Sequence, residues 1–273
     1  MLLGHEDKKK IFQRLIQEGR LAHGYLFFGE NHIGKFLFAR SLANLLENQQ
    51  FEEPKTMLTE TLIVQPEGGS IGIDAVRECK QFLARAPIQS AYRTLLIDNA
   101  DTLTNQAQNA ILKLAEEPPR HALIILISLS PDTVLPTLQS RLQKIYFSRI
   151  KSEVIEKALK DRYGITPQKA EVLAKESFGK PGLAIEALQN AMDKNAELLI
   201  KRLFGASSKR DIIEAALEDP VLTDKFLAKV MARLAKDPIR NYRVLNKLAD
   251  SLVKMSDFNT NKRLQLESAL WTL

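Results

Sequence analysis

The sequence has very little cysteine and no long apolar run. A single cysteine, Cys79, in 273 residues excludes an intrachain disulfide and fits a reducing compartment. The first ten residues, MLLGHEDKKK, become charged too early for a secretory signal, and no apolar run is long enough to span a bilayer. We therefore expect a cytoplasmic protein with no membrane partner. Cys79 shares a helical face with Val76 and Leu83, so we expect a buried thiol.

Metal-binding patterns are also scarce. Residues 48–60 read as an exposed polar connection that contains no cysteine or histidine, so no metal cluster is available there. Hydrophobic and charged residues make up an ordinary 45% and 26% of the chain. The balance of 39 basic to 33 acidic residues gives a net charge of +6. This excess permits contact with nucleic acid without requiring it.

One stretch has the pattern of a phosphate-binding loop between a strand and a helix, with GENHIGK at residues 29–35. Gly29 and Gly34 let the backbone wrap around phosphate oxygens, and the following helix N-terminus presents free N–H groups. Lys35 can reach the terminal phosphates. The pattern G-x-x-x-x-G-K-[ST] then requires a hydroxyl for Mg²⁺, but this chain has Phe36. The loop is therefore either a residual phosphate site or a glycine turn that binds no ligand.

Residues 94–141 form the block around which we expect the chain to be organised. The apolar run TLLID ends in Asp98, where a phosphate-bound metal could lie, because ligands bind at the carboxyl ends of parallel strands. Thr104 is a good N-cap for a helix that Pro118-Pro119 must stop. Residues 122–128 predict a strand buried on both faces. The order strand, helix, strand predicts one parallel crossover.

Other elements follow from similar patterns. Asp74 is predicted as the N-cap of an amphipathic helix that runs to about Ala86. Residues 61–65 and 144–147 predict two short strands. From residue 150 onward no strand-like run remains, and helical periodicity continues to the end. The chain is long enough for two or three cores.

Taken together, the motifs resemble the AAA+ ATPases, and more closely the clamp-loader branch. In order they are GHE, AHGYLFFGENHIGK, SIGIDAVREC, TLLIDNADTLTNQAQNAILKLAEEPP and LPTLQSRLQ. They are similar to the delta-prime subunits of bacterial DNA polymerase III clamp loaders. The run GKPGLA at residues 179–184 and a last helix entered through Asn259 to Leu266 extend the likeness. The resemblance implies an α/β P-loop (AAA+) domain with a parallel sheet at residues 1–149, a small helical lid domain at 150–190 and an all-α collar domain, used for assembly, at 191–273.

Three departures from the family pattern imply that the site does not hydrolyse ATP. Phe36 replaces the magnesium-binding hydroxyl, and Asn99 stands where active members carry the glutamate that activates water. Leu183 replaces the usual arginine of the lid. Hydrolysis needs the metal and an oriented nucleophile. No cofactor is therefore required, and residual nucleotide binding stays open. The family's zinc-binding cysteine cluster is missing, so we predict no zinc. Gly29, Gly34, Lys35 and Asp98 are the residues of the nucleotide site that this degenerate version retains.

Ser140-Arg141-Leu142 matches the family's Ser-Arg-Cys motif except at its cysteine. The resemblance implies that Arg141 acts in trans, as an arginine finger on the ATP of a neighbouring motor subunit. Its guanidinium fork suits phosphate oxygens, and such a finger typically contributes about 10³–10⁵ in turnover. The alternative role is a surface ion pair worth about 0–1 kcal/mol.

The function implied by the resemblance is that of a non-catalytic clamp-loader subunit, which helps load the sliding clamp onto primer-template DNA during DNA replication. The implied partners are the motor subunits (gamma/tau) and the delta subunit, with the sliding clamp contacted indirectly and primer-template DNA held within the assembled ring. An active AAA+ ATPase is the alternative, and Phe36 and Asn99 count against it. A free DNA-binding module is a third hypothesis, which only the basic charge suggests.

Overall fold

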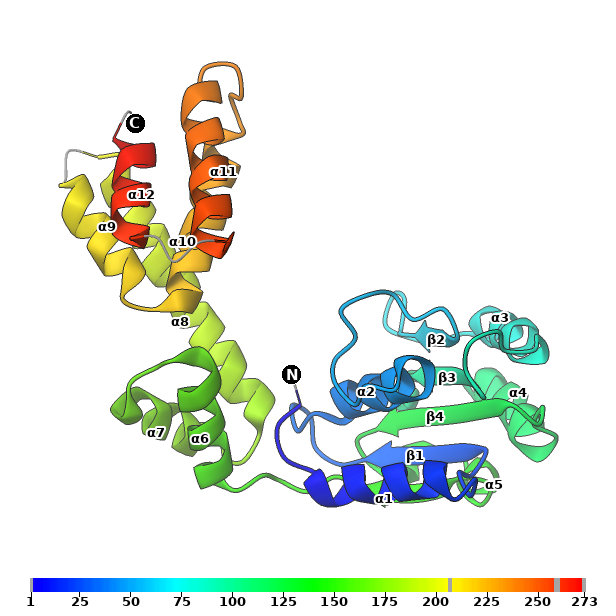
Figure 1. Ribbon diagram of the computed structural model, residues 1–273. Helices are drawn as coiled ribbons and strands as arrows, with labels where there is room; N and C mark the ends of the chain where they lie inside the picture. The colour runs from blue at the N-terminus through cyan, green and yellow to red at the C-terminus, as the bar shows by residue number, and fades with distance from the viewer. Residues whose placement is uncertain (1, 206–207, 258–260, 272–273) are drawn as a thin grey trace. The chain divides into compact units, whose positions relative to one another are not determined.

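The computed structural model describes residues 2–205, 208–257 and 261–271 (Figure 1). The chain divides into two compact units, residues 1–155 with 177–182, and residues 156–176 with 183–273. The first unit contains the sheet and the second is helical. The domain boundaries expected at 149/150 and 190/191 stay a prediction, and helix α8 (Pro181–Leu203) runs without a break across the second of them.

Five parallel strands form the sheet of the first unit, in the order β2-β3-β4-β1-β5. Figure 1 labels the first four of these. The strands are β1 Gly24–Phe28, β2 Thr61–Val64, β3 Arg93–Ile97, β4 Ala122–Ser128 and β5 Gln143–Tyr146. Central strand β4 is buried along its whole length and pairs with β1 and β3. The predicted strand at residues 122–128 and the parallel β3–β4 crossover are therefore confirmed, and so is the α/β class.

Helices cover both faces of this sheet, because successive side chains of a strand point to opposite faces. The helices of the first unit are α1 Glu6–Gln17, α2 Lys35–Asn48, α3 Ile73–Ala84, α4 Asn105–Glu116 and α5 Pro136–Gln139. Phe12 of α1 and Phe38 of α2 meet Phe27 of β1 on one face, in edge-to-face ring contacts. Helices α3, α4 and α5 cover the other face. Cys79 is fully buried there, as predicted, and burial raises the pKa of its thiol to about 11.

Thr104 and Asp74 were both predicted as N-caps, and only Thr104 is one. The Thr104 hydroxyl accepts a hydrogen bond from the Ala107 N–H at 3.2 Å, at the start of α4. The prediction for Asp74 is wrong, because the N-cap of α3 lies two residues earlier, at the extended Gly72. The Asp74 carboxylate lies in the first turn instead and accepts from Arg77 at 2.6 Å.

The second unit consists of helices, which confirms the helical periodicity predicted from residue 150 onward. The helices from this point on are α6 Ser152–Tyr163, α7 Pro167–Glu176, α8 Pro181–Leu203, α9 Lys209–Leu217, α10 Pro220–Leu234, α11 Tyr242–Asp257 and α12 Lys262–Leu270. Lys225 of α10 pairs with Asp193 of α8 at 2.7 Å, and Arg263 of α12 pairs with Glu214 of α9 at 2.7 Å. Asn259 lies outside the described residues.

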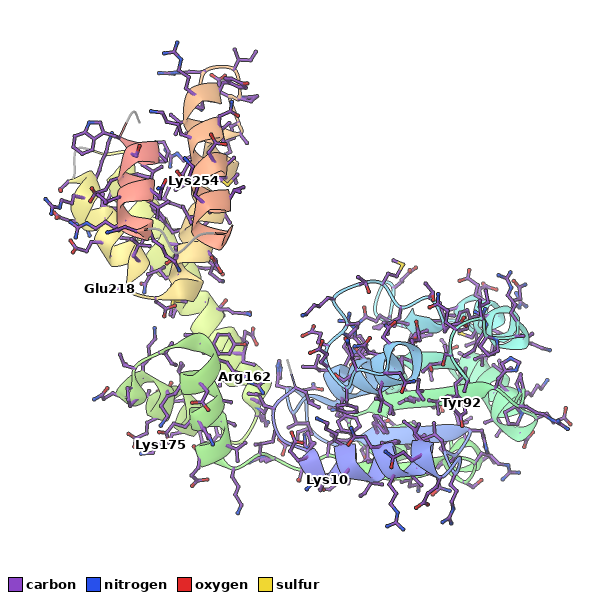
Figure 2. All side chains as sticks on the ribbon, viewed as in Figure 1. Lys10, Tyr92, Arg162, Lys175, Glu218 and Lys254 are labelled. Carbon is purple, nitrogen blue, oxygen red and sulfur yellow. The ribbon has the colours of Figure 1, made fainter. Side chains whose placement is uncertain are left out.

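Charged side chains, Lys10 and Lys175 among those labelled, project outward from the helices of each unit (Figure 2). Within the described ranges, none of the helices combines the length and the apolar character needed to cross a bilayer.

Candidate functional site

The predicted phosphate loop and Asp98 lie at the same edge of the sheet. Strands β1 and β3 flank β4 in parallel, so the loop after β1 and the acid after β3 both follow carboxyl ends. Gly29 and Gly34 have φ angles of +142° and +96°, which side chains rarely tolerate. A Cβ atom at Gly29 would also collide with the Phe147 carbonyl. Both positions therefore need glycine, and phosphate binding by this loop stays a prediction.

Lys35 is directed back onto its own loop. Its Nζ donates hydrogen bonds to the carbonyl oxygens of Gly29 and Glu30, both at 2.6 Å, and the residue is only 7% exposed. Burial lowers the pKa of the ammonium, while the carboxylates of Asp98 and Asp101 act in the opposite direction. To reach a phosphate, this ammonium would first have to leave two carbonyl oxygens.

The positions that would serve Mg²⁺ and water are occupied by other interactions. Phe36 packs against the aromatic core beneath α2, and the Arg40 guanidinium lies 5.8 Å from its ring centroid. A phenyl ring offers no oxygen ligand for Mg²⁺. The Asp98 carboxylate accepts from the Gln65 amide at 3.2 Å and from the Asn99 backbone N–H at 3.0 Å. Asn99 itself is exposed, with φ at +51°.

Glu30 of the loop belongs to a charged cluster that the sequence did not indicate. The Glu30 carboxylate accepts from Arg149 Nε and Nη2 at 2.6 and 3.0 Å, and it pairs with Lys180 Nζ at 2.6 Å. These two cations lower the pKa of Glu30 to about 2. The Gly182 N–H donates to the His32 carbonyl at 2.8 Å, and a Cβ at Gly182 would approach that carbonyl to 2.9 Å.

The N-terminal segment supports the same loop. His5 Nε2 donates to the Ile33 carbonyl at 2.9 Å, and its ring makes an edge contact with Phe147 at 4.8 Å. His5 is 8% exposed, and burial lowers the pKa of its imidazole. The histidine of the GHE motif therefore has a structural role in this fold.

Ser128 is another residue of this edge that the sequence analysis did not name. It ends β4 between the phosphate loop and Asp98, is 2% exposed, and donates to the Ser130 carbonyl at 3.0 Å. The sequence could have indicated Ser128, because it places a hydroxyl at the carboxyl end of a predicted buried strand.

Arg141 lies at the opposite edge of the sheet. It follows α5 and precedes β5, whose first residue Gln143 pairs with Tyr25 near the start of β1. Its side chain is 47% exposed, and its guanidinium donates to Ser140 Oγ at 3.0 Å and to Glu116 Oε1 at 3.5 Å. The five-residue β1 spans about 16 Å at roughly 3.3 Å per residue, so Arg141 is far from its own phosphate loop.

No three histidine, cysteine, aspartate or glutamate side chains within the described ranges gather closely enough to hold a metal ion. The zinc prediction stays a prediction, as do the roles assigned to Gly29, Gly34, Lys35, Asp98 and Arg141. Leu183 lies in the first turn of α8, which begins at Pro181.

Comparison with known proteins gives relatives that match between about half and three quarters of the chain. The gamma/tau subunit of DNA polymerase III from Mycobacterium tuberculosis (strain ATCC 25618 / H37Rv) is 34% identical over 51% of this chain and 27% of its own length. The delta' subunits from Bacillus subtilis (strain 168) and Haemophilus influenzae are 29% and 27% identical, over 60% and 54% of this chain and 54% and 45% of their own lengths. The chain thus spans about a quarter to half of these curated relatives.

A solved structure with a similar fold is the RuvB Holliday junction branch migration motor from Thermotoga maritima. It is 19% identical, with a TM-score of 0.52 over 96% of this chain and 88% of that one. Together with the relatives above, this likeness confirms the AAA+ fold of the clamp-loader branch. The model of one family, described as DNA polymerase III, delta subunit, matches residues 4–151, which is more than half of the chain. The chain therefore belongs to the DNA polymerase III delta subunit family.

Proposed function

We propose that this chain is a non-catalytic subunit of a DNA polymerase III clamp loader, which acts in the cytoplasm and helps load the sliding clamp onto primer-template DNA. Its own phosphate loop does not turn over ATP, and Arg141 completes the ATP site of a neighbouring gamma/tau motor subunit. The observation that carries the proposal is the separation of these features, with a closed phosphate loop at one edge of the sheet and an exposed guanidinium at the other.

The contacts around the phosphate loop support the absence of ATP hydrolysis at this site. Lys35 is engaged by two loop carbonyls, Phe36 offers no ligand for Mg²⁺, and both oxygens of Asp98 accept hydrogen bonds. Hydrolysis needs a metal to neutralise developing charge and a group to orient water. The chain therefore requires no nucleotide, magnesium or zinc for its role. Any nucleotide that bound would have to displace Lys35 and pass the Glu30 cluster.

The role of Arg141 in trans follows from its position. Its guanidinium is too far from its own loop to act there, so only another subunit can bring a phosphate to it. The contact with Glu116 is a 3.5 Å pair between two half-exposed side chains, which is worth about 0–1 kcal/mol. Such a weak pair can be exchanged for a phosphate contact when subunits assemble, because a guanidinium fork binds phosphate oxygens strongly.

The test is Arg141→Ala in a complex reconstituted with the motor and delta subunits, the sliding clamp and primer-template DNA. We expect the chain to stay folded and the ATP hydrolysis of the complex to fall, because one site loses about 10³–10⁵ in turnover. The matched control is Arg14→Ala, which removes an exposed arginine that pairs with Glu18 on α1. An unchanged rate for Arg141→Ala, or an equal loss for Arg14→Ala, would contradict the proposal.

The alternative function, an active clamp-loader ATPase, has one observation in its favour. Gly29, Gly34, Lys35 and Asp98 still lie at one edge of the sheet, where a nucleotide would bind. The purified chain with ATP and Mg²⁺ separates the two functions. Turnover that disappears in Lys35→Ala would establish the alternative, whereas we expect none above background.

A further inference from the structure

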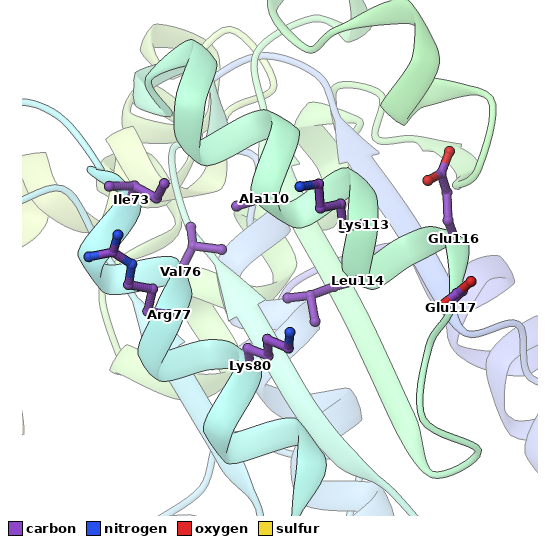
Figure 3. Close-up of a pocket in the computed structure, with 9 residues that line it drawn as sticks. All are labelled: Ile73, Val76, Arg77, Lys80, Ala110, Lys113, Leu114, Glu116 and Glu117. Carbon is purple, nitrogen blue, oxygen red and sulfur yellow. The ribbon is translucent and has the colours of Figure 1, made fainter.

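A groove runs between α3 and α4 on the face of the sheet opposite α1 and α2 (Figure 3). Its cavity measures about 480 Å³, a size typical of sites that bury a ligand or a few side chains. No residue of this groove takes part in the phosphate loop, and only Glu116 contacts Arg141. The residues that line it are Ile73, Val76, Arg77, Lys80, Ala110, Lys113, Leu114, Glu116 and Glu117.

Both walls of the groove are regular helical stripes. On α3 the lining residues from Ile73 to Lys80 are spaced i, i+3, i+4 and i+7. Ala110, Lys113, Leu114 and the C-cap Glu117 repeat this spacing along α4, with Glu116 beside them. Residues at this spacing share one helix face, so each helix presents a single stripe to the groove. The floor is apolar, because Val76 and Leu114 are buried there, and the small side chain of Ala110 leaves room between the helices.

Cationic side chains rise on both sides of this apolar floor. Figure 3 shows Lys80 extending from α3 toward Leu114, and Lys113 extending from α4 toward α3. Within the described residues, no carboxylate lies within ion-pair distance of either ammonium. Arg77 adds a third cation, which pairs with its neighbour Asp74 on the same helix and is 69% exposed. The groove therefore offers positive charge on two walls that its own acids do not neutralise.

We propose that this groove binds an acidic peptide segment of a partner protein. An apolar side chain of the segment lies on the floor beside Ala110, and its carboxylates lie between Lys80 and Lys113. Glu117 stands at the far end of α4, so a basic residue at that end of the segment completes the match. Nucleic acid fits less well, because a phosphodiester chain has nothing to bury on an apolar floor and meets Glu116 and Glu117 at one end. Complementary charge of this kind favours orientation and specificity.

The test uses the full chain and a fluorescein-labelled peptide, EELDDLLEEK, followed by fluorescence anisotropy. We expect saturable binding below about 1 mM that weakens as salt is added. Lys80→Glu combined with Lys113→Glu should weaken it at least about tenfold, since both attractions become repulsions. Ala110→Trp should weaken it to a similar extent without a change of charge, because the indole fills the floor. Circular dichroism verifies that each variant is folded.

The control variant combines Lys10→Glu and Lys55→Glu, which changes the net charge by the same amount on exposed positions away from the groove. It should bind the peptide like the unmodified chain. Equal loss in this control would overturn the proposal, as would equal binding of the charge-reversed peptide KKLKKLLKKE. A duplex oligonucleotide that displaces the peptide, and whose own binding needs Lys80 and Lys113, would make the groove a phosphate site and would also overturn it.

Discussion

At the scale of single residues, the phosphate loop is held by charges that belong to other parts of the chain. Glu30 is the central residue, because it accepts two hydrogen bonds from Arg149 and pairs with Lys180. Glu30 thus ties the loop after β1 to two cations that follow β5 in the sequence, and its single negative charge offsets one of their two positive charges.

The Glu30 cluster should make stability depend on pH. The carboxyl titrates at about 2 in the folded chain and near 4.5 without its partners. Because the folded value is the lower one, the cluster stabilises the fold above about pH 4.5, and this contribution is lost as the pH falls toward 2. In urea titrations at several pH values, the stability difference between the unmodified chain and Glu30→Gln should therefore shrink as the pH is lowered. A difference that stays constant would contradict this assignment.

The partners provide the control for that measurement. Arg149→Gln combined with Lys180→Gln should remove most of the same pH-dependent difference, and adding Glu30→Gln to this pair should change little further. Such non-additivity identifies a direct interaction between neighbouring residues. Additive effects at every pH would mean that Glu30 acts independently of Arg149 and Lys180.

At the scale of the elements, the sequence predicted features that depend on neighbouring residues, such as strand β4 and the N-cap of α4. Strand β4 matches its predicted residues because seven consecutive buried residues leave no alternative at that length. Thr104 caps α4, but the cap assigned to Asp74 lies two residues inside the observed one, since a glycine can start a helix without any side-chain bond. Boundaries of this kind depend on φ and ψ at one residue, which composition does not determine.

The two candidate caps give a prediction about stability. Thr104→Ala should lower the free energy of unfolding by about 1 kcal/mol, because the Ala107 N–H loses its acceptor. Asp74→Ala should cost much less, since it removes only an exposed pair with Arg77. Urea unfolding with an unchanged m-value measures both. A larger loss for Asp74→Ala than for Thr104→Ala would contradict the observed start of α3.

Only part of the candidate site could be predicted from the sequence. Gly29, Gly34 and Lys35 are adjacent in sequence, so their spacing indicated a phosphate loop. Glu30 and Arg149 lie 119 residues apart, and no periodicity connects them. The direction of the Lys35 side chain could not be predicted either. The same sequence is compatible with a lysine that reaches a phosphate and with one that donates to the carbonyls of its own loop.

At the scale of the whole chain, the parallel sheet separates the two features on which the proposed function rests. All strands run the same way, so the loop after β1 and Asp98 lie at one edge and Arg141 lies at the other. About 16 Å of buried strand lies between Phe36 at the first edge and Arg141 at the second. Under the proposed function, the first edge can therefore lose ATP turnover while the second edge still presents Arg141 to a neighbour.

The final prediction tests whether Arg141 acts through its shape or only through its charge. Arg141→Lys keeps the positive charge but replaces the planar fork with a single ammonium, which cannot bind two phosphate oxygens at once. In the reconstituted complex, with clamp and primer-template DNA at saturation, we expect the ATP hydrolysis of Arg141→Lys to fall close to that of Arg141→Ala. Glu116→Gln should keep the full rate, because it removes only the surface partner of the arginine. If the lysine restored the full rate, long-range charge would explain the effect, and the arginine-finger role would be wrong.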